Sequence, residues 1–448
     1  MEGKLLDKYK WDIYFWVLFI FIVIFQIGNS FRYPQFLDEY FHILRGKSLE
    51  YWGGFPLTEY FELAPVGRPN LYPPLYHLLL LFLHKLGVDW LQASKIMSII
   101  VVPFFCVVYF YVLKKMVSSC AGFFFVLVSF STHSFFLSLV NNIPATLSLV
   151  WMILAFYFMN REKICASAVF LSLSFYTHPF LGYLVLFSLL LYSIFLFRKG
   201  LRAILWGLIL SAPFIYHQFR YIELVNWQPL YESKTLEFNI FIILSFLGGL
   251  RFVCKNKRYL YFVILVILSV LSMGGGGYFY RLLSSQFSLF ESTFDNLFKK
   301  SLKSASLSIW FPKYYLPVKK VILRHTQEND IIYSNIPALG VLFSCLCGRP
   351  TTCALFREVG PFYEFDRIEN ASLCVILKSA SFWENIENLD KFAERNFKLV
   401  GENELFYIFY RKPKRRFSLM YPLVVNLKYI YLILAVYTGI ILEEVCRK

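Results

Sequence analysis

The sequence lacks the short motifs that mark the commonest cofactor and metal sites of soluble proteins. Gly340 and Gly348 are isolated, and no GxGxxG or Walker pattern follows a predicted strand, so a glycine-rich phosphate loop is not expected. The nine cysteines include no CxxC pair, which is evidence against a structural zinc site. Charge is also sparse: Asp, Glu, Lys and Arg make up 17% of the 448 residues, against roughly 25% in soluble domains.

Hydrophobic residues are correspondingly abundant. They make up 58% of the chain, and a single water-soluble core cannot absorb them without large exposed apolar patches. Apolar runs long enough to cross ~30 Å of hydrocarbon recur along the chain. They lie at 13–42, 96–113, 119–139, 143–159, 164–197 (two crossings), 203–219, 238–253, 259–273 and 420–442. The sequence therefore predicts an α-helical polytopic membrane protein with about ten transmembrane helices.

The basic residues predict how these helices are oriented. Lys and Arg give a formal net charge of +16, but they cluster in short loops between apolar runs, as the positive-inside rule expects. We therefore expect no nucleic-acid partner. The first segment follows three lysines but has no cleavage pattern, and we interpret it as a retained anchor with a cytoplasmic N-terminus. Residues 31–95 then form an outer loop, in which 72–86 is too short and too polar to cross and lies along the interface.

We expect three parts: a transmembrane domain at 1–310, an α/β soluble domain at 311–415 and a final transmembrane helix at 416–448. Strands are predicted at 331–334, 351–355, 373–378 and 405–410, with helices from Pro337 to Gly348 and near 382–395. The soluble domain is placed outside the cell, as a binding or scaffolding accessory. Its basic end at 412–416 favours the cytoplasm instead, and a crossing by 279–298 would reverse its side, although Arg281, Glu291 and Asp295 oppose that crossing.

The outer loop concentrates the candidate site residues. Asp38, Glu39 and His42 occur in DEYFH directly after the first membrane segment. Adjacent carboxylates repel each other, so the pair either holds a divalent cation or divides into a base with a raised pKa and an ionised partner. Asp38 and His42 share one helix face at i, i+4, which suits a metal ligand or a group that orients a base. The competing interpretation is a plain acidic and aromatic cap at the membrane interface.

Two further residues have both a functional and a structural interpretation. His178 precedes the helix-breaking Pro179. In the functional interpretation it binds a phosphate or acts as a general acid, and in the structural interpretation it caps a helix end. Arg281 follows the glycines at 274–277 and either clamps a phosphate or reaches ordinary lipid headgroups. The pair Asn141–Asn142 is suited to binding a sugar or to capping the next helix.

Together, DEYFH at 38–42 and GRPNLYPPLYHLLL at 67–80 resemble the GT-C superfamily of polyprenyl-phosphate-dependent membrane glycosyltransferases. This superfamily includes protein O-mannosyltransferases, aminoarabinose transferases and the catalytic subunit of oligosaccharyltransferase. The resemblance implies a GT-C fold and a catalytic base or metal contact at Asp38 or Glu39. The chain departs from several relatives in offering only Asn141 and Asn142 where they carry a second acidic residue, which puts metal dependence in question. It also has fewer crossings than many of them.

The resulting hypothesis is inverting transfer of a sugar from a polyprenyl-phosphate donor in the membrane lipid to an extracytoplasmic acceptor, at the cell membrane. Asp38 and Glu39 are the predicted catalytic residues, and both with His42 are the alternative ligands of a divalent cation, which is the only cofactor considered. The predicted substrate-binding residues are His42, Arg68, Tyr72, His77, His178 and Arg281. The rival hypotheses are a transporter or lipid flippase, for which no internal repeat is found, and a non-catalytic scaffold.

Overall fold

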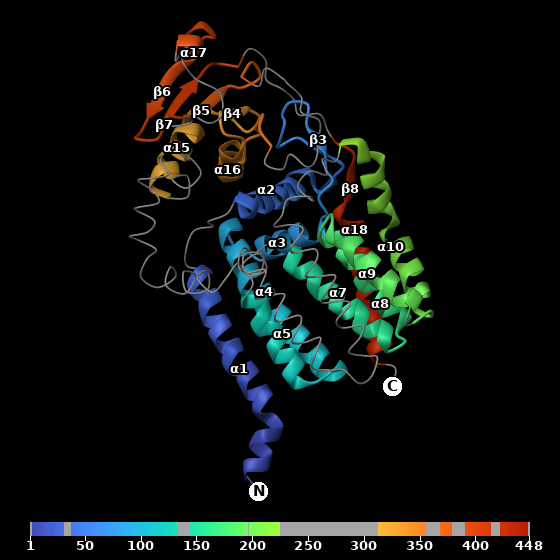
Figure 1. Cartoon of the computed structure of the whole chain (residues 1–448). Helices are drawn as coiled ribbons and strands as arrows, with labels where there is room; N and C mark the ends of the chain where they lie inside the picture. Colours follow the sequence, from blue (N-terminus) through green and yellow to red (C-terminus); the bar gives the residue numbers. More distant parts are fainter. Residues whose placement is uncertain are drawn as a thin grey trace.

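The computed structural model describes residues 2–30, 37–131, 144–195, 197–224, 312–354, 368–378, 390–413 and 422–446 (Figure 1). Their largest unit is a helical bundle. It contains α1 (Glu2–Ser30), α4 (Trp90–Met116), α5 (Ser119–Ser131), α7 (Pro144–Asn160), α8 (Ile164–Thr177), α9 (Leu181–Phe195), α10 (Gly200–Arg220) and α18 (Leu427–Cys446). In the described residues, the segments Tyr9–Gly28, Trp90–Met116 and Gly200–Arg220 are long and apolar enough to cross a membrane. The predicted crossings at 238–253 and 259–273 lie outside the described residues.

Polar contacts tie the helix ends together at the end of the bundle where both termini lie (Figure 1). Lys114 of α4 pairs with Asp12 of α1 at 2.8 Å, and the turn after α9 meets the turn after α7 through Lys199 and Glu162. Glu444 near the end of α18 accepts hydrogen bonds from the first backbone N–H groups of α8. The predicted basic loops after α4, α7 and α9 therefore share one side of the bundle.

The outer loop folds at the opposite end of the bundle. It contains α2 (Leu37–Trp52), β1 (Gly54–Pro56), the short pair β2 (Thr58–Glu59) and β3 (Arg68–Pro69), and α3 (Leu75–Lys85). At 1.5 Å per residue, the 11 residues of α3 reach about 16 Å, too little to cross the bilayer. Gly87 turns the chain at φ +91°, and Asp89 then caps α4 by accepting from Leu91 N–H. The predicted interfacial segment is thus a separate helix, although α4 begins six residues before the predicted crossing at 96.

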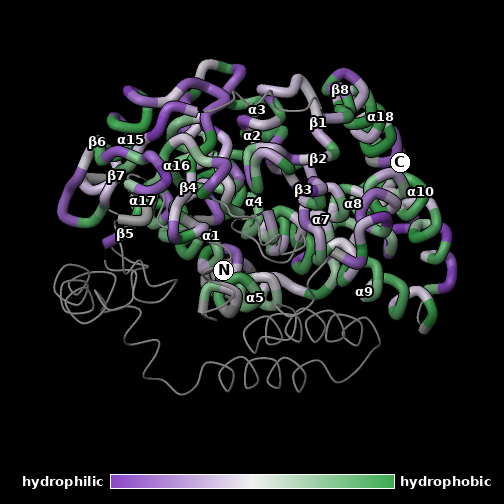
Figure 2. The backbone as a smooth tube through the Cα atoms, turned by 90° about the horizontal axis from the view of Figure 1, so that it is seen from above, coloured by the Kyte–Doolittle hydropathy of each residue, from purple (hydrophilic) through white to green (hydrophobic). Residues whose placement is uncertain are grey.

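An α/β module follows, with α15 (Pro312–His325), β4 (Ile332–Ser334), α16 (Pro337–Cys347), β5 (Leu373–Leu377), α17 (Asp390–Glu394), β6 (Lys398–Glu402) and β7 (Phe406–Tyr410). Its sheet has the order β4-β5-β7-β6, with β4 and β5 parallel and the other pairs antiparallel. Alternate side chains of β5 face α15 and α16 on one side and Phe392 of α17 on the other. Hydrophilic residues gather in this module when the molecule is viewed from above, whereas the bundle helices are largely hydrophobic (Figure 2).

Most of the predicted module elements are present. The helix after Pro337 ends at Gly348, which has the left-handed φ of +63° that favours glycine. Of the segment predicted as a strand at 351–355, the described residues 351–354 form a single bridge, between Thr351 and Ile332. Part of the helix predicted at 382–395 lies outside the described residues. Neither α15 nor β6 was predicted from the sequence pattern. The boundaries predicted at 310 and 415 stay predictions.

The module is seated directly on the outer loop, because the two share one hydrophobic core. The backbone of Thr351 donates to Phe61 O and accepts from Ala64 N–H, and the hydroxyls of Tyr40 and Tyr315 lie 3.2 Å apart. A second connection comes from β8 (Val424–Asn426), which pairs antiparallel with β1 just before α18 enters the bundle. The outer loop and the module therefore lie on the same side of the helical bundle.

Candidate active site

Asp38 and Glu39 occupy the first turn of α2, where this helix begins at the edge of the bundle. Both side chains are only partly accessible to water. Burial raises the pKa of Asp38 to about 6. Burial and the neighbouring Asp38 raise the pKa of Glu39 to about 8, opposed by the positive charge of Lys95 in α4. At neutral pH the two adjacent carboxyls therefore differ in charge, with Asp38 mostly ionised and Glu39 mostly protonated.

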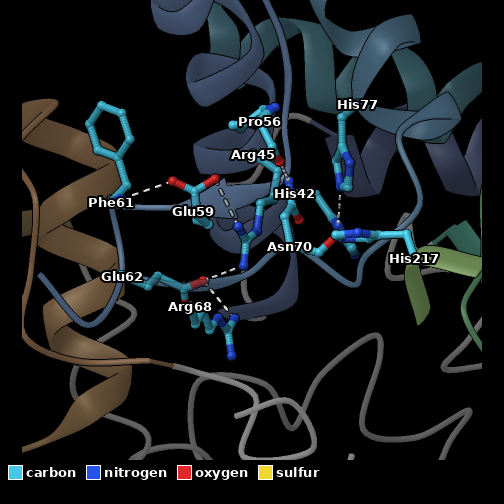
Figure 3. Close-up of polar contacts among 10 residues, drawn as sticks. All are labelled: His42, Arg45, Pro56, Glu59, Phe61, Glu62, Arg68, Asn70, His77 and His217. Carbon is cyan, nitrogen blue, oxygen red and sulfur yellow. Dashed lines mark hydrogen bonds and ion pairs between the residues drawn. The ribbon is translucent and has the colours of Figure 1, made fainter. Parts of the chain in front are cut away.

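One turn further along α2, His42 meets His77 from α3. His42 Nδ1 lies 3.0 Å from His77 Nε2, and both side chains are buried (Figure 3). Burial lowers the pKa of both imidazoles, to about 3 for His77 and well below the usual value for His42, whose neighbours His77, His178 and Arg45 add to the effect. The two rings are consequently neutral across the physiological range.

Tyr72 joins this histidine pair to His178. Its ring centroid lies 5.1 Å from that of His42, 5.5 Å from that of His77 and 6.2 Å from that of His178. His178 Nδ1 accepts hydrogen bonds from the N–H groups of Phe180 and Leu181, so its ring caps the start of α9. The structure thus gives His178 a capping role and also places it beside two other predicted substrate-binding residues.

Arg68 lies in a buried ion-pair network rather than beside the histidines (Figure 3). Glu62 accepts from Arg68 at 2.6 Å and from Arg45 at 2.5 Å, and Arg45 also pairs with Glu59 at 2.8 Å. These side chains are at most 4% exposed. The network gives Arg68 a structural role in holding β3 against α2, and a direct contact with substrate stays a prediction.

The sequence reasoning missed four charged residues near the site. Arg45 follows His42 by about one helical turn, a spacing that was available as a signal, and Glu59 and Glu62 flank the aromatic pair at 60–61. Lys95 directly precedes the apolar run predicted at 96–113. Only the fold brings it near Glu39.

The structure does not describe every predicted site residue. Arg281 and Asn141–Asn142 lie outside the described residues. Within the described ranges, no three His, Cys, Asp or Glu side chains are grouped as the ligands of a metal ion would be. The divalent cation on Asp38, Glu39 and His42 therefore stays a prediction.

Comparison with known proteins gives a likeness at the level of structure. No protein-family model matches the chain, and no curated protein matches its sequence. The crystal structure of ArnT from Cupriavidus metallidurans bound to undecaprenyl phosphate aligns with a TM-score of 0.52 at 11% identity, over 88% of this chain and 97% of that one. The apo state of the same ArnT aligns with a TM-score of 0.52 at 12% identity and equal coverage. The chain therefore shares its fold with ArnT, which confirms the predicted fold class of a helical polytopic protein with a C-terminal α/β domain.

Proposed function

We propose that this chain is a membrane glycosyltransferase that moves a sugar from a polyprenyl-phosphate donor to an extracytoplasmic acceptor. The observation that carries the proposal is the pair Asp38 and Glu39, half-buried where α2 leaves the bundle and enclosed by an outer loop and module in a fold shared with ArnT. A carboxyl pair with separated pKa values at such a position is typical of acid–base chemistry.

Asp38 is the better base of the two. A general base works best when its pKa lies near the working pH and it is ionised there, and Asp38 meets both conditions with a pKa of about 6. Glu39, with a pKa of about 8, keeps its proton at neutral pH and serves as a hydrogen-bond donor or a neutral neighbour. Of the two carboxyls predicted to be catalytic, Asp38 is therefore the proposed base.

In the proposed reaction, the acceptor hydroxyl gives its proton to Asp38 while its oxygen forms a bond to the anomeric carbon of the donor sugar. The bond from that carbon to the phosphate oxygen breaks, and its electron pair leaves with the phosphate. Attack opposite to the leaving group inverts the anomeric centre. A phosphate is already a good leaving group, so no general acid comparable to that of a glycosidase is required.

Two observations support a lipid donor that arrives from the bilayer. The ArnT crystal structure contains undecaprenyl phosphate, as its description states. In addition, the site lies at the end of helices with outward-facing apolar residues, including Ile20 and Ile24 of α1, so a lipid tail can lie against the bundle while its headgroup reaches α2. Arg281 or His178 is the proposed partner of the departing phosphate.

The positive-inside rule supports an extracytoplasmic site. The basic loops after α4, α7 and α9 share one side of the bundle, and the outer loop and module occupy the other (Figure 1). With the basic loops in the cytoplasm, Asp38 and the module face the opposite compartment.

The test is reconstitution of the full chain in liposomes with a panel of polyprenyl-phosphate sugars carrying a labelled sugar. Labelled product and free polyprenyl phosphate are both measured. We expect Asp38→Asn to lower the rate about 10²- to 10⁴-fold, the usual contribution of a general base, and Glu39→Gln to have a smaller effect. Glu50→Gln, on the same helix but at its far end, is the matched control. Wild-type transfer rates in both Asp38→Asn and Glu39→Gln would contradict the proposal. Movement of the intact donor across the bilayer without product would favour a transporter instead.

A further inference from the structure

The helix that carries Asp38 and Glu39 packs directly against the α/β module. Figure 1 shows α16 of the module over α2, and the two helices are in contact. Apolar residues of α2, α15 and α16 belong to one hydrophobic core. Apolar packing is non-directional, whereas hydrogen bonds favour one geometry, so the polar contacts across this core are the ones that set the position of α2.

The first of these contacts is made by Tyr40, the residue next to Glu39. Its hydroxyl lies 3.2 Å from the hydroxyl of Tyr315 in α15, and the two side chains are 0% and 1% exposed. Burial and the neighbouring Tyr315 raise the pKa of Tyr40 above its ordinary value, so its hydroxyl stays protonated at physiological pH. A buried hydroxyl without a partner is costly, so this contact favours one position of Tyr40.

The second contact is made by Lys47, seven residues further along α2. Its ammonium group donates to the backbone oxygen of Cys345 at 2.7 Å. Cys345 lies in the last turn of α16, where the carbonyl groups have no partner within the helix and form the negative end of the helix dipole. A cation is well matched to this place, so Lys47 stabilises the contact between α2 and α16.

Tyr40 and Lys47 lie on the same face of α2, because seven residues make nearly two helical turns. Contacts with the outer loop hold a different face, through His42 and Arg45. The helix is therefore held between the outer loop and the module. Asp38 lies two residues before Tyr40, about 3 Å along the helix axis, so a displacement of Tyr40 also displaces the carboxyl pair.

We propose that the module positions the first turn of α2, with Tyr315 as the positioning residue that acts through Tyr40 on Asp38. This inference rests on the proposed function, and it replaces the accessory role that the sequence suggested for the module. A displacement of about 1 Å can lower a catalysed rate about 100-fold, so Tyr315 affects turnover without touching the substrate. A module that only binds the acceptor would affect KM instead.

The kinetic test uses the full chain in liposomes with the labelled polyprenyl-phosphate sugars of the transfer assay. Tyr315→Phe removes the partner of the buried Tyr40 hydroxyl and should lower kcat about 10- to 100-fold with little change in KM. The double variant Tyr40→Phe, Tyr315→Phe removes both hydroxyls and should recover most of the wild-type kcat. Tyr407→Phe, on the face of the sheet turned toward α17, is the control. A rise in KM at unchanged kcat, or a double variant as slow as Tyr315→Phe, would overturn the inference.

The second contact is tested by a loss and its conservative rescue. Lys47→Met removes the cation at the end of α16 and should lower kcat, whereas Lys47→Arg keeps a donor for the Cys345 oxygen and should restore most of it. A wild-type kcat in both Tyr315→Phe and Lys47→Met would contradict a positioning role of the module.

Hydrogen exchange of the same variants in lipid nanodiscs tests the positioning without turnover. We expect the backbone at 38–47 to exchange about 10-fold faster in Tyr315→Phe and near the wild-type rate in the double variant. The backbone at 373–377, in the central strand β5, should keep the wild-type rate in all of them. Unchanged exchange at 38–47 in Tyr315→Phe refutes the positioning role. Faster exchange at 373–377 also refutes it, because the module itself has then opened.

The two measurements separate this inference from the proposed function. If the wild type yields no labelled product, the proposed function fails, and exchange at 38–47 still decides whether the module holds α2. If the wild type is active and Tyr315→Phe keeps the wild-type kcat, the inference fails and the proposed function stands.

Discussion

Charge balance in the buried network of Arg45, Glu59, Glu62 and Arg68 gives the sharpest test of what Arg68 does. Among the residues that the structure describes, two guanidinium groups and two carboxylates lie together at 4% exposure or less, and the formal charges of these four groups cancel. Glu62→Gln leaves a buried excess of +1, and Arg68→Gln leaves −1. Removing one partner of a buried ion pair costs about 3–5 kcal/mol, because the other charge stays buried without compensation.

The expected magnitude is measurable as hydrogen exchange of the backbone at 54–70, the segment that the network holds. A loss of 3–5 kcal/mol from the local opening free energy accelerates exchange by roughly two to four orders of magnitude. The double variant Glu62→Gln, Arg68→Gln restores the balance, so it should exchange within about 10-fold of the wild type. The exposed pair Lys199 and Glu162, at 65% and 57% exposure, is the control, and its loss should cost at most about 1 kcal/mol.

Two results would refute this reasoning. If the two single variants and the double variant exchange alike, the charges do not compensate each other. If Arg68→Gln abolishes glycosyl transfer while exchange at 54–70 stays at the wild-type rate, Arg68 acts on the substrate, as the sequence suggested, and its ion pair is incidental.

Three other predictions concern the site, the topology and the bundle. The catalytic efficiency kcat/KM should rise with pH through about 6, as Asp38 becomes an ionised base, and fall through about 8, as Glu39 ionises beside it. Glu39→Gln should remove only the fall at alkaline pH. A flat pH profile of kcat/KM contradicts the assignment. Cysteines placed at the exposed positions Tyr51 and Leu399 should both react with a membrane-impermeant maleimide from the same side of sealed vesicles, and labelling from opposite sides would contradict the seating of the module on the outer loop. Glu444→Ala should destabilise the detergent-solubilised protein by about 1–2 kcal/mol in an unfolding titration because α8 loses its cap, whereas Glu444→Gln, which keeps an acceptor, should lose less; equal losses contradict the capping role.

The sequence predicted the features that depend on local pattern. Apolar runs identified the bundle helices, a run too short to cross identified α3, and Pro337 with Gly348 delimited α16. These signals are readable because the bilayer thickness and the glycine conformation act on consecutive residues. The first turn of α4 was missed because Gln92, Ser94 and Lys95 interrupt the apolar pattern just before the run at 96–113.

The features that depend on long-range contact were not predictable in the same way. DEYFH placed Asp38, Glu39 and His42 together, but nothing in it indicates that His42 meets His77 or that His178 lies beside Tyr72. The burial of Arg68 depends on Glu62, and Lys95 approaches Glu39 from a different helix. Such partners are separated by tens of residues, so only the packing of α2, α3 and α4 determines them.

The pairing of β1 with β8 has a consequence for how the protein is made. Gly54 is synthesised 372 residues before its strand partner Asn426. At roughly 5–20 residues per second, the outer loop waits tens of seconds for the strand that completes it. During that interval the edge of β1 is unpaired, a state that invites pairing with other chains. A nascent chain at this stage therefore depends on protection of that edge, and C-terminal truncations that remove β8 should be recognised by quality control even when every bundle helix before it has inserted.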